Sequence, residues 1–193
     1  MYKRQPNYYG SAAAQSLASL VGMAGTLLIC APTAVKLSQK FGKKELATAG
    51  AIVGAVSYLL CFFLRPANPF VYVAFAAVAT VSMGYFNTVV WAMITDVIDD
   101  TEVRTGVRED GTVYSVYSFA RKLGQAISSG LIGGLLTMIG YSEATAFDPA
   151  VTGKIFNLAC LAPFAGFVAL ALILMFLYPL NKTRVEQNIA TLA

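Results

Sequence analysis

The chain has 193 residues, 57% of them hydrophobic and only 12% charged, with a net charge of +4. Soluble domains are roughly half apolar and a quarter charged, so this composition excludes an ordinary water-soluble domain and predicts a protein solvated by membrane lipid. The modest charge, with basic residues not gathered on an aromatic-rich face, argues against nucleic acid as a partner.

Five long apolar stretches follow one another, at about residues 11–38, 46–64, 70–98, 112–141 and 155–180. Each approaches or exceeds the roughly 20 residues that a helix needs to cross a bilayer core. Alternation with period two is absent, so strands are not expected. The sequence therefore predicts an all-α membrane protein with about five transmembrane helices, which together form one partial bundle over residues 1–193.

The connections between these stretches are polar and contain residues that stop helices. Residues 40–44 form a basic turn with a central glycine, and residues 65–69 form a turn bounded by prolines. Residues 99–111 are strongly charged, and residues 141–154 are polar. Such segments are typical of loops at the membrane surface.

The residues that usually carry metal or acid–base chemistry are scarce. There is no histidine, and the three cysteines, Cys30, Cys61 and Cys160, all lie inside apolar stretches. We expect these cysteines to be small buried hydrophobic residues, because their spacing matches neither a metal motif nor a disulfide framework. Without a nucleophile–base pair or a carboxylate pair inside a span, the sequence predicts no enzyme, metal site or cofactor.

The distribution of basic residues predicts the orientation, because cytoplasmic loops carry an excess of Lys and Arg. With the C-terminus in the cytoplasm, the inner side carries Lys36, Lys40, Lys43, Lys44, Arg104, Arg108, Lys182 and Arg184. The outer side then carries Lys3, Arg4, Arg65 and Lys154. We therefore expect the N-terminus outside and the C-terminus inside. An odd number of spans with an external N-terminus is typical of a piece of a longer chain.

The stretch at 112–141 carries a polar stripe. The members of the stripe are three or four residues apart and so share one helix face: Ser118, Arg121, Lys122, Gln125 and Ser129, with Tyr114 one turn earlier. An ionised side chain near the membrane midplane costs about 3 kcal/mol, so two adjacent ones need a polar cavity or a partner. Their donors suit a hydroxyl-rich or an anionic ligand. Snorkelling of Arg121 and Lys122 to the headgroups is the alternative.

The charged segment after the third stretch allows two interpretations. Residues 70–96 would form about 40 Å of helix, which places Asp96 at the cytoplasmic interface. Acidic groups at a helix C-terminus oppose its dipole and need cations, and Arg104 and Arg108 are close in sequence. The segment is either a solvated loop or an ion-pair latch that holds a transporter closed on one side.

The same segment carries a family resemblance. One ordered set resembles the signature loop of the glycoside–pentoside–hexuronide:cation symporters of the major facilitator superfamily: Asp96, Asp99, Glu102, Arg104, Thr105, Gly106, Arg108 and Gly111. A second set is similar to the eleventh helix of that family: Tyr114, Ser115, Ser118, Phe119, Arg121, Lys122, Gly124, Gln125 and Ala126. Residues 40–44 and 176–180 resemble the family's segments after its eighth and last helices. Within the family, the glucuronide carriers look most similar.

The resemblance implies helices eight to twelve of a twelve-helix transporter in a bacterial inner membrane. That transporter would couple sugar or glycoside uptake to a proton or sodium gradient, and residues 96–108 would act as its cytoplasmic gating loop. The coupling cation, H⁺ or Na⁺, would bind mainly in the N-terminal half. The expected partners are therefore membrane lipid, that N-terminal half and the sugar. Because the site lies between two bundles, this chain alone is not expected to transport.

The resemblance also assigns substrate-binding residues. It implies that Lys122 faces the central cavity and that Tyr117, Ser118 and Arg121 lie near the sugar, while Gln125 belongs to the same stripe. Melibiose permeases have a sugar-stacking tryptophan at the position of Asn87. Its absence argues against galactosides, although Trp91 lies one turn later. Two further family aromatics are replaced, by Asp100 and Val103.

Two functions remain open from the sequence. The first is the C-terminal part of a symporter, and the second is a non-transporting remnant that packs against partner helices. The intramembrane Lys122 favours the first, because a remnant has no reason to keep a costly charge. Arg121 beside Lys122 favours an anionic substrate such as a uronide, while a neutral pentoside also fits the hydroxyl and amide donors.

Overall fold

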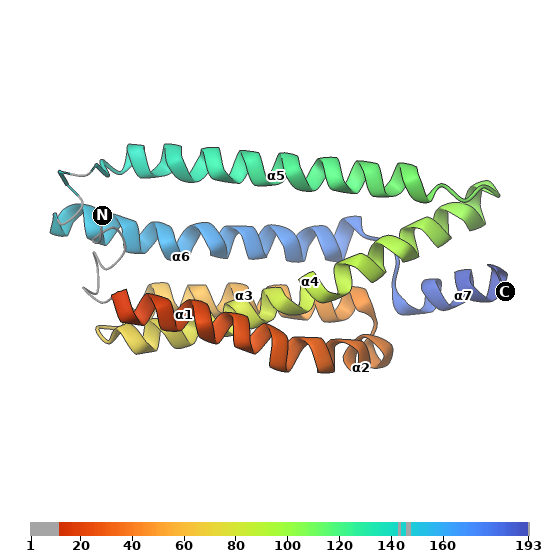
Figure 1. Ribbon diagram of the computed structural model, residues 1–193, viewed down its shortest axis with the longest axis horizontal. Helices are drawn as coiled ribbons and strands as arrows, with labels where there is room; N and C mark the ends of the chain where they lie inside the picture. The colour runs from red at the N-terminus through yellow and green to blue at the C-terminus, as the bar shows by residue number, and fades with distance from the viewer. Residues whose placement is uncertain (1–11, 143, 146–147, 193) are drawn as a thin grey trace.

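The computed structural model describes residues 12–142, 144–145 and 148–192, and the regular structure of these residues is entirely helical. The α-helices are α1 (Ala12–Gly25), α2 (Ala31–Phe41), α3 (Lys43–Leu64), α4 (Pro69–Thr105), α5 (Asp110–Met138), α6 (Pro149–Leu172) and α7 (Lys182–Leu192). Two π-helical turns are η1 (Thr26–Cys30) and η2 (Ile173–Leu177). The long helices run side by side along one axis, with α4 crossing obliquely (Figure 1). The prediction of an all-α protein is confirmed.

Four of the five expected spans correspond to helices long and apolar enough to cross a membrane. These segments are Leu20–Phe41, Lys43–Leu64, Pro69–Thr105 and Pro149–Leu177. The fifth expected span is α5, which has 29 residues but is less apolar because it carries the polar stripe. The predicted fifth crossing, and the predicted partial-bundle boundaries, remain predictions.

The first span is continuous through a π-turn. In η1 the N–H of Ala31 donates to the carbonyl of Thr26, five residues earlier. Pro32, in the first turn of α2, has no N–H and its ring would clash with the carbonyl four residues before it. A wider π-turn just before a proline is a recognised way to relieve both problems. The predicted basic turn is shorter than expected, since only Gly42, at φ +107°, separates α2 from α3.

The third span is longer than predicted, and this corrects the expected charged loop. α4 begins at a good cap, where Asn68 Oδ1 accepts from the Phe70 N–H at 2.9 Å. It continues past residue 98 to Thr105, and it ends at Gly106, whose φ of +73° suits a glycine. Most of the predicted gating loop is therefore helical, and only residues 106–109 lie outside helices. The helix continues because residues 99–105 contain neither proline nor glycine.

Helices α1, α3, α4 and α6 form the packed part of the molecule. Small residues allow the close approach: a Cβ on Gly50 would lie 3.0 Å from the carbonyl oxygen of Ser82. The three cysteines are free and fully buried, which confirms their predicted role. Cys61 and Cys160 join α3 to α6 in one apolar cluster with Phe156.

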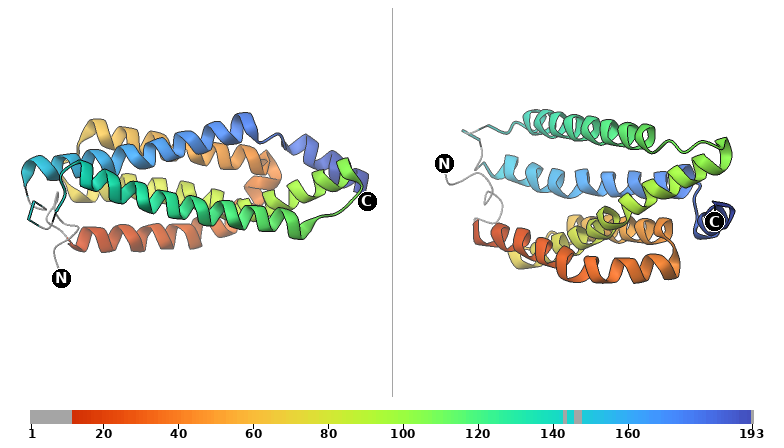
Figure 2. Two further views of the ribbon diagram at one scale, coloured as in Figure 1. Left: turned by 90° about the horizontal axis from the view of Figure 1, so that it is seen from above. Right: turned by 45° about the vertical axis from the view of Figure 1, so that its right-hand side comes forward.

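Helix α5 stands apart from this packed part (Figures 1 and 2). None of its residues is buried in the described structure. A Cβ added at Gly130 or Gly134 would meet nothing within 4 Å there. The spacing of these glycines does not bring another described helix close.

One end of the bundle gathers the basic residues that the sequence assigned to the cytoplasm. The end of α2, the start of α3, the end of α4 and all of α7 lie at the right of Figure 1. Lys182 Nζ donates to the carbonyl of Lys40 at 3.2 Å, which ties α7 to α2. The opposite end holds Arg65, whose Nη2 donates to Asn157 Oδ1 at 3.1 Å. The two sides of the predicted charge asymmetry are thus two real ends of the molecule, while Lys3 and Arg4 lie outside the described residues.

Candidate substrate site

An aromatic and cationic cluster joins α4 to α5. The Trp91 ring lies 5.4 Å from the Tyr117 ring at an edge-on 71°, and 6.5 Å from the Tyr114 ring at 29°. The guanidinium carbon of Arg121 lies 5.7 Å from the centre of the Trp91 ring, a cation–π distance. The structure therefore brings together three predicted site residues, Trp91, Tyr117 and Arg121. We call these residues, with Tyr114, the Trp91 cluster.

Helical spacing explains how the Trp91 cluster forms. Tyr114, Tyr117 and Arg121 are three and four residues apart, so they share one face of α5. Asn87 lies one turn before Trp91, and both are exposed. Trp91 is 48% exposed and has the Arg121 guanidinium beside its ring. The Trp91 cluster therefore combines a flat aromatic ring with a positive charge on an exposed part of α4 and α5.

The remaining predicted site residues extend this surface along α5. Ser118, Lys122 and Gln125 are exposed, and Lys122 makes no ion pair with any described residue. The main-chain carbonyl of Gln125 accepts from Ser128 Oγ and Ser129 Oγ at 3.0 and 2.9 Å. Apart from the contacts of Arg121 and Tyr114 with Trp91, no ion pair or ring contact joins the polar stripe to another described helix. The substrate-binding roles of its members remain predictions.

A second cluster links the end of α4 to the start of α5. Arg108 Nη1 donates to Asp99 Oδ1 at 3.0 Å and to Glu102 Oε2 at 2.7 Å, while Nε donates to Asp110 Oδ2 at 3.1 Å. These acceptors, Glu102 first, raise the pKa of Arg108 above its already high ordinary value. Arg108 therefore stays charged and clamps the turn at residues 106–109.

The other predicted members of the gating segment make weaker or purely local contacts. Arg104 is exposed, and its Nη1 lies 3.9 Å from Asp100 Oδ2. Thr105 Oγ1 donates to the carbonyl of Thr101 at 2.8 Å, inside α4, and Gly106 ends the helix. A latch role for these residues remains a prediction.

Two acidic residues of α4 are buried, and the sequence did not reveal their partners. Asp96 is 5% exposed, and its Oδ1 lies 2.5 Å from Lys43 Nζ at the start of α3. Asp100 is 7% exposed and accepts from Arg184 Nε and Nη2 at 2.9 and 3.2 Å, and from Asn188 Nδ2 at 3.0 Å. The expectation that nearby Arg104 and Arg108 would neutralise this helix end is therefore incomplete.

The reason for this omission is sequence distance. Lys43 is 53 residues from Asp96, and Arg184 is 84 residues from Asp100, so no helical spacing connects them. One signal was available for Asp100, which stands where the resembled family has a tyrosine. A carboxylate in place of an aromatic ring requires a new cationic partner, and α7 supplies one.

Comparison with known proteins identifies the family of the chain. A family model described as "MFS/sugar transport protein" matches residues 6–182. The chain belongs to this family. The match covers nearly all of the described helices, including the Trp91 cluster. The predicted resemblance to sugar symporters of the major facilitator superfamily is confirmed.

Several curated relatives are also named as transporters. A putative sulfoquinovose importer of Escherichia coli is 36% identical over 160 residues, which are 83% of this chain and 33% of the relative. A glucuronide carrier protein homolog of Escherichia coli is 33% identical over 157 residues, 81% of this chain and 34% of the relative. A putative glycoside/cation symporter of the same organism is 37% identical over 105 residues, 52% and 23% of the two chains.

The chain spans about a third of the length of the first two of these relatives. No solved structure matches it. These proteins are named as transporters, so the chain is a membrane protein of a transporter family.

Proposed function

We propose that this chain is the C-terminal part of a secondary active symporter that takes up an anionic sugar or glycoside. The observation that carries the proposal is the Trp91 cluster together with Lys122, which presents an aromatic face beside two cations without acidic partners among the described residues. Family membership supports a sugar as the substrate, and the two cations support a negative charge on that sugar. Relatives named for sulfoquinovose and for a glucuronide are consistent with a negatively charged substrate.

Each group has a distinct part in the proposed recognition. The Trp91 ring stacks on the apolar face of a sugar ring, a contact that aromatic side chains make well. Arg121 presents a planar fork to a carboxylate or sulfonate, while Lys122 adds a compact positive charge. Ser118 and Gln125 supply donors and acceptors for the sugar hydroxyls. An anionic substrate offsets the penalty of holding two cations at this depth.

The proposed site is completed by a second bundle. In transporters of this kind the substrate lies between two six-helix halves that rock about it, and half a site neither binds tightly nor alternates. The N-terminal half therefore supplies the other wall and most of the cation-binding residues for H⁺ or Na⁺. The basic end of the bundle supports a cytoplasmic C-terminus, because cytoplasmic segments carry an excess of Lys and Arg.

The test is uptake by the reassembled transporter. This chain is co-expressed with the N-terminal half of a close relative, and membrane vesicles are given radiolabelled glucuronide, sulfoquinovose or a neutral xyloside under a proton or a sodium gradient. Arg121→Ala and Lys122→Ala are compared with Leu123→Ala, which changes the next residue along α5. We expect uptake of the anionic sugars alone, loss of uptake in the first two variants, and little change in the third.

Other outcomes would reject parts of the proposal. Uptake that survives both substitutions in well-inserted protein would show that the polar stripe is not the site. Equal uptake of the xyloside would reject the anionic substrate. No uptake from a well-inserted pair would favour a non-transporting protein that packs against partner helices.

A further inference from the structure

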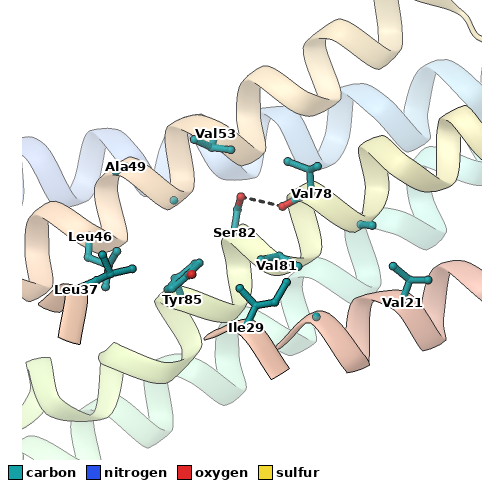
Figure 3. A pocket seen from close by; sticks show the side chains of 13 residues that line it. Val21, Ile29, Leu37, Leu46, Ala49, Val53, Val78, Val81, Ser82 and Tyr85 are labelled. Atoms are coloured by element: carbon teal, nitrogen blue, oxygen red, sulfur yellow. Dashed lines mark hydrogen bonds between the residues drawn. The ribbon is translucent and has the colours of Figure 1, made fainter. Parts of the chain in front are cut away.

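A second surface lies along an earlier part of α4. An open groove of about 550 Å³ runs between α1 with η1 on one wall and α3 on the other, with α4 as its floor (Figure 3). On α4 the groove is lined by Ala77, Val78, Val81, Ser82 and Tyr85, and no residue of the Trp91 cluster lines it. The groove is therefore distinct from the proposed substrate site.

The chemistry of the groove favours an apolar occupant. Among its described lining residues, the polar side chains are those of Ser82 and Tyr85. Ser82 Oγ donates to the carbonyl of Val78 at 2.8 Å, and Tyr85 OH is 2.9 Å from Thr33 Oγ1. Both groups are satisfied, so nothing in the groove requires water or a sugar hydroxyl.

The walls show why the surface is hollow. Val21, Ile29, Val53 and Val78 are 45–49% exposed, so branched apolar side chains edge the groove without filling it. Gly25 lies between the first two and has no side chain at all. Such a hollow suits a flexible apolar chain, and the lipid acyl chains around a membrane protein are of this kind.

The end of the groove carries positive charge. Leu37 of α2 closes the groove there, and Lys36 and Lys40 lie within about 100° of it on the helix surface. Both lysines are exposed, and neither makes an ion pair with a described residue. Their neighbours differ, because Lys43 pairs with Asp96 and Lys44 Nζ donates to the Tyr178 carbonyl at 2.7 Å.

The two lysines lie at the depth expected for lipid headgroups. Lys40 Nζ lies 5.2 Å from the ring centre of Phe41, which is 53% exposed. An exposed aromatic beside a lysine at a helix end is typical of the membrane interface. From Leu37 to Val21, at the two ends of this wall, is sixteen residues, or about 24 Å of helix, which exceeds the roughly 15 Å depth of one leaflet of the core. The groove is therefore long enough to hold an acyl chain through the depth of a leaflet, with the headgroup at the level of the two lysines.

We propose that this groove binds one acyl chain of an anionic phospholipid, with the phosphate-bearing headgroup against Lys36 and Lys40. The two lysines have no acidic partners in the described structure, so they distinguish an anionic headgroup from a zwitterionic one. The proposal concerns a lipid on the outer surface of the bundle and does not depend on the sugar.

A tryptophan reporter tests this directly. In a Trp91→Phe background, Val53→Trp places the reporter in the groove. Val56→Trp places it on the next turn of α3 at similar exposure, 47% against 49%, but outside the groove. The full chain is reconstituted in vesicles that contain phosphatidylglycerol or phosphatidylcholine brominated on the acyl chain, and quenching gives the relative affinity of each lipid.

We expect the groove reporter to prefer phosphatidylglycerol, by about fivefold for each lysine. Lys36→Ala with Lys40→Ala removes the preference, whereas Lys154→Ala, at the opposite end, leaves it. The Val56→Trp reporter shows no preference. If the Val53→Trp protein does not fold, as judged by circular dichroism, Val21→Trp on the other wall replaces it.

Three results would overturn the proposal. Equal quenching by both lipids at the groove would mean ordinary boundary lipid. A preference that persists without the two lysines would mean that they do not hold the headgroup. A reporter that neither lipid quenches would mean that the groove is covered by protein, either a second copy or another helix.

Discussion

Helices α3 and α5 are both long, and both contain glycines and basic residues, but their surroundings differ. α3 has six buried residues, among them Ala47, Ala51 and Gly54, and it packs against α4 and α6. α5 has none in the described structure. Small residues let helices approach but do not by themselves bring a neighbour. Among the long helices of the described structure, α5 is the one with no buried residue.

The basic residues of α3 and α5 also differ in their partners. On α3, Lys43 pairs with the carboxylate of Asp96, and Lys44 donates to carbonyls beyond the end of α6. On α5, Arg121 lies over an aromatic ring and Lys122 has no described acidic partner. The α3 cations thus serve the fold. The α5 cations have no acidic partner among the described residues, and substitutions should separate the two groups.

The largest effect is expected from Lys43→Ala. It leaves Asp96 buried without its cation, and removing one member of a buried pair typically costs about 3–5 kcal/mol. Thermal unfolding of the purified chain in detergent measures the loss. Lys40→Ala, an exposed lysine close by, is the control and should change little. The double variant Lys43→Ala with Asp96→Asn should recover part of the loss; if it does not, the ion pair is not the cause.

The next effect is expected from Gly50→Val compared with Gly130→Val. The first forces a side chain against the Ser82 carbonyl, and overpacking costs about 1–3 kcal/mol. The second meets nothing in the described structure, so the isolated chain should keep its unfolding temperature. If Gly130→Val destabilises only the reassembled transporter, that result would locate the partner's contact on α5. Equal destabilisation in the isolated chain would contradict the comparison.

A smaller effect is expected at the far end of α4. Arg184→Ala removes two hydrogen bonds to buried Asp100, but Arg184 is 40% exposed and Asn188 remains, so we expect a loss of about 1 kcal/mol. Hydrogen exchange of α7 should rise. Arg104→Ala, which removes a 3.9 Å pair from a residue 72% exposed, should leave α7 unchanged. Equal exchange in both variants would mean that Arg184 does not anchor α7.

The smallest effect on stability is expected from Lys122→Ala. An exposed side chain without a described ion-pair partner contributes within about 0.5 kcal/mol, so the unfolding temperature in detergent should hold while uptake is lost. Alanine at Lys122 that unfolds the isolated chain would instead assign this lysine to the fold.

Much of the fold is a local property of the sequence. The apolar stretches predict the long helices, because hydrophobic length and helix rise are fixed by neighbouring residues. The buried cysteines follow from their apolar surroundings, and the family follows from the ordered set between Asp96 and Ala126. The polar stripe of α5 was also visible, because members of one helix face recur every three or four residues.

Other features depend on segments that are distant in sequence. The partners of Asp96 and Asp100 come from helices 53 and 84 residues away. The contact of Trp91 with Arg121 depends on how α5 returns alongside α4. The continuation of α4 to Thr105 was missed because charged residues were expected to form a loop.

The sequence by itself therefore determined the helices, their polar and apolar faces and the family, since these depend on local composition and spacing. Only the tertiary structure decided which cations pair with buried carboxylates and which have no acidic partner among the described residues. The physical reason is that neutralising a buried charge requires a partner within a few ångströms, and which residues come that close is set by helix packing.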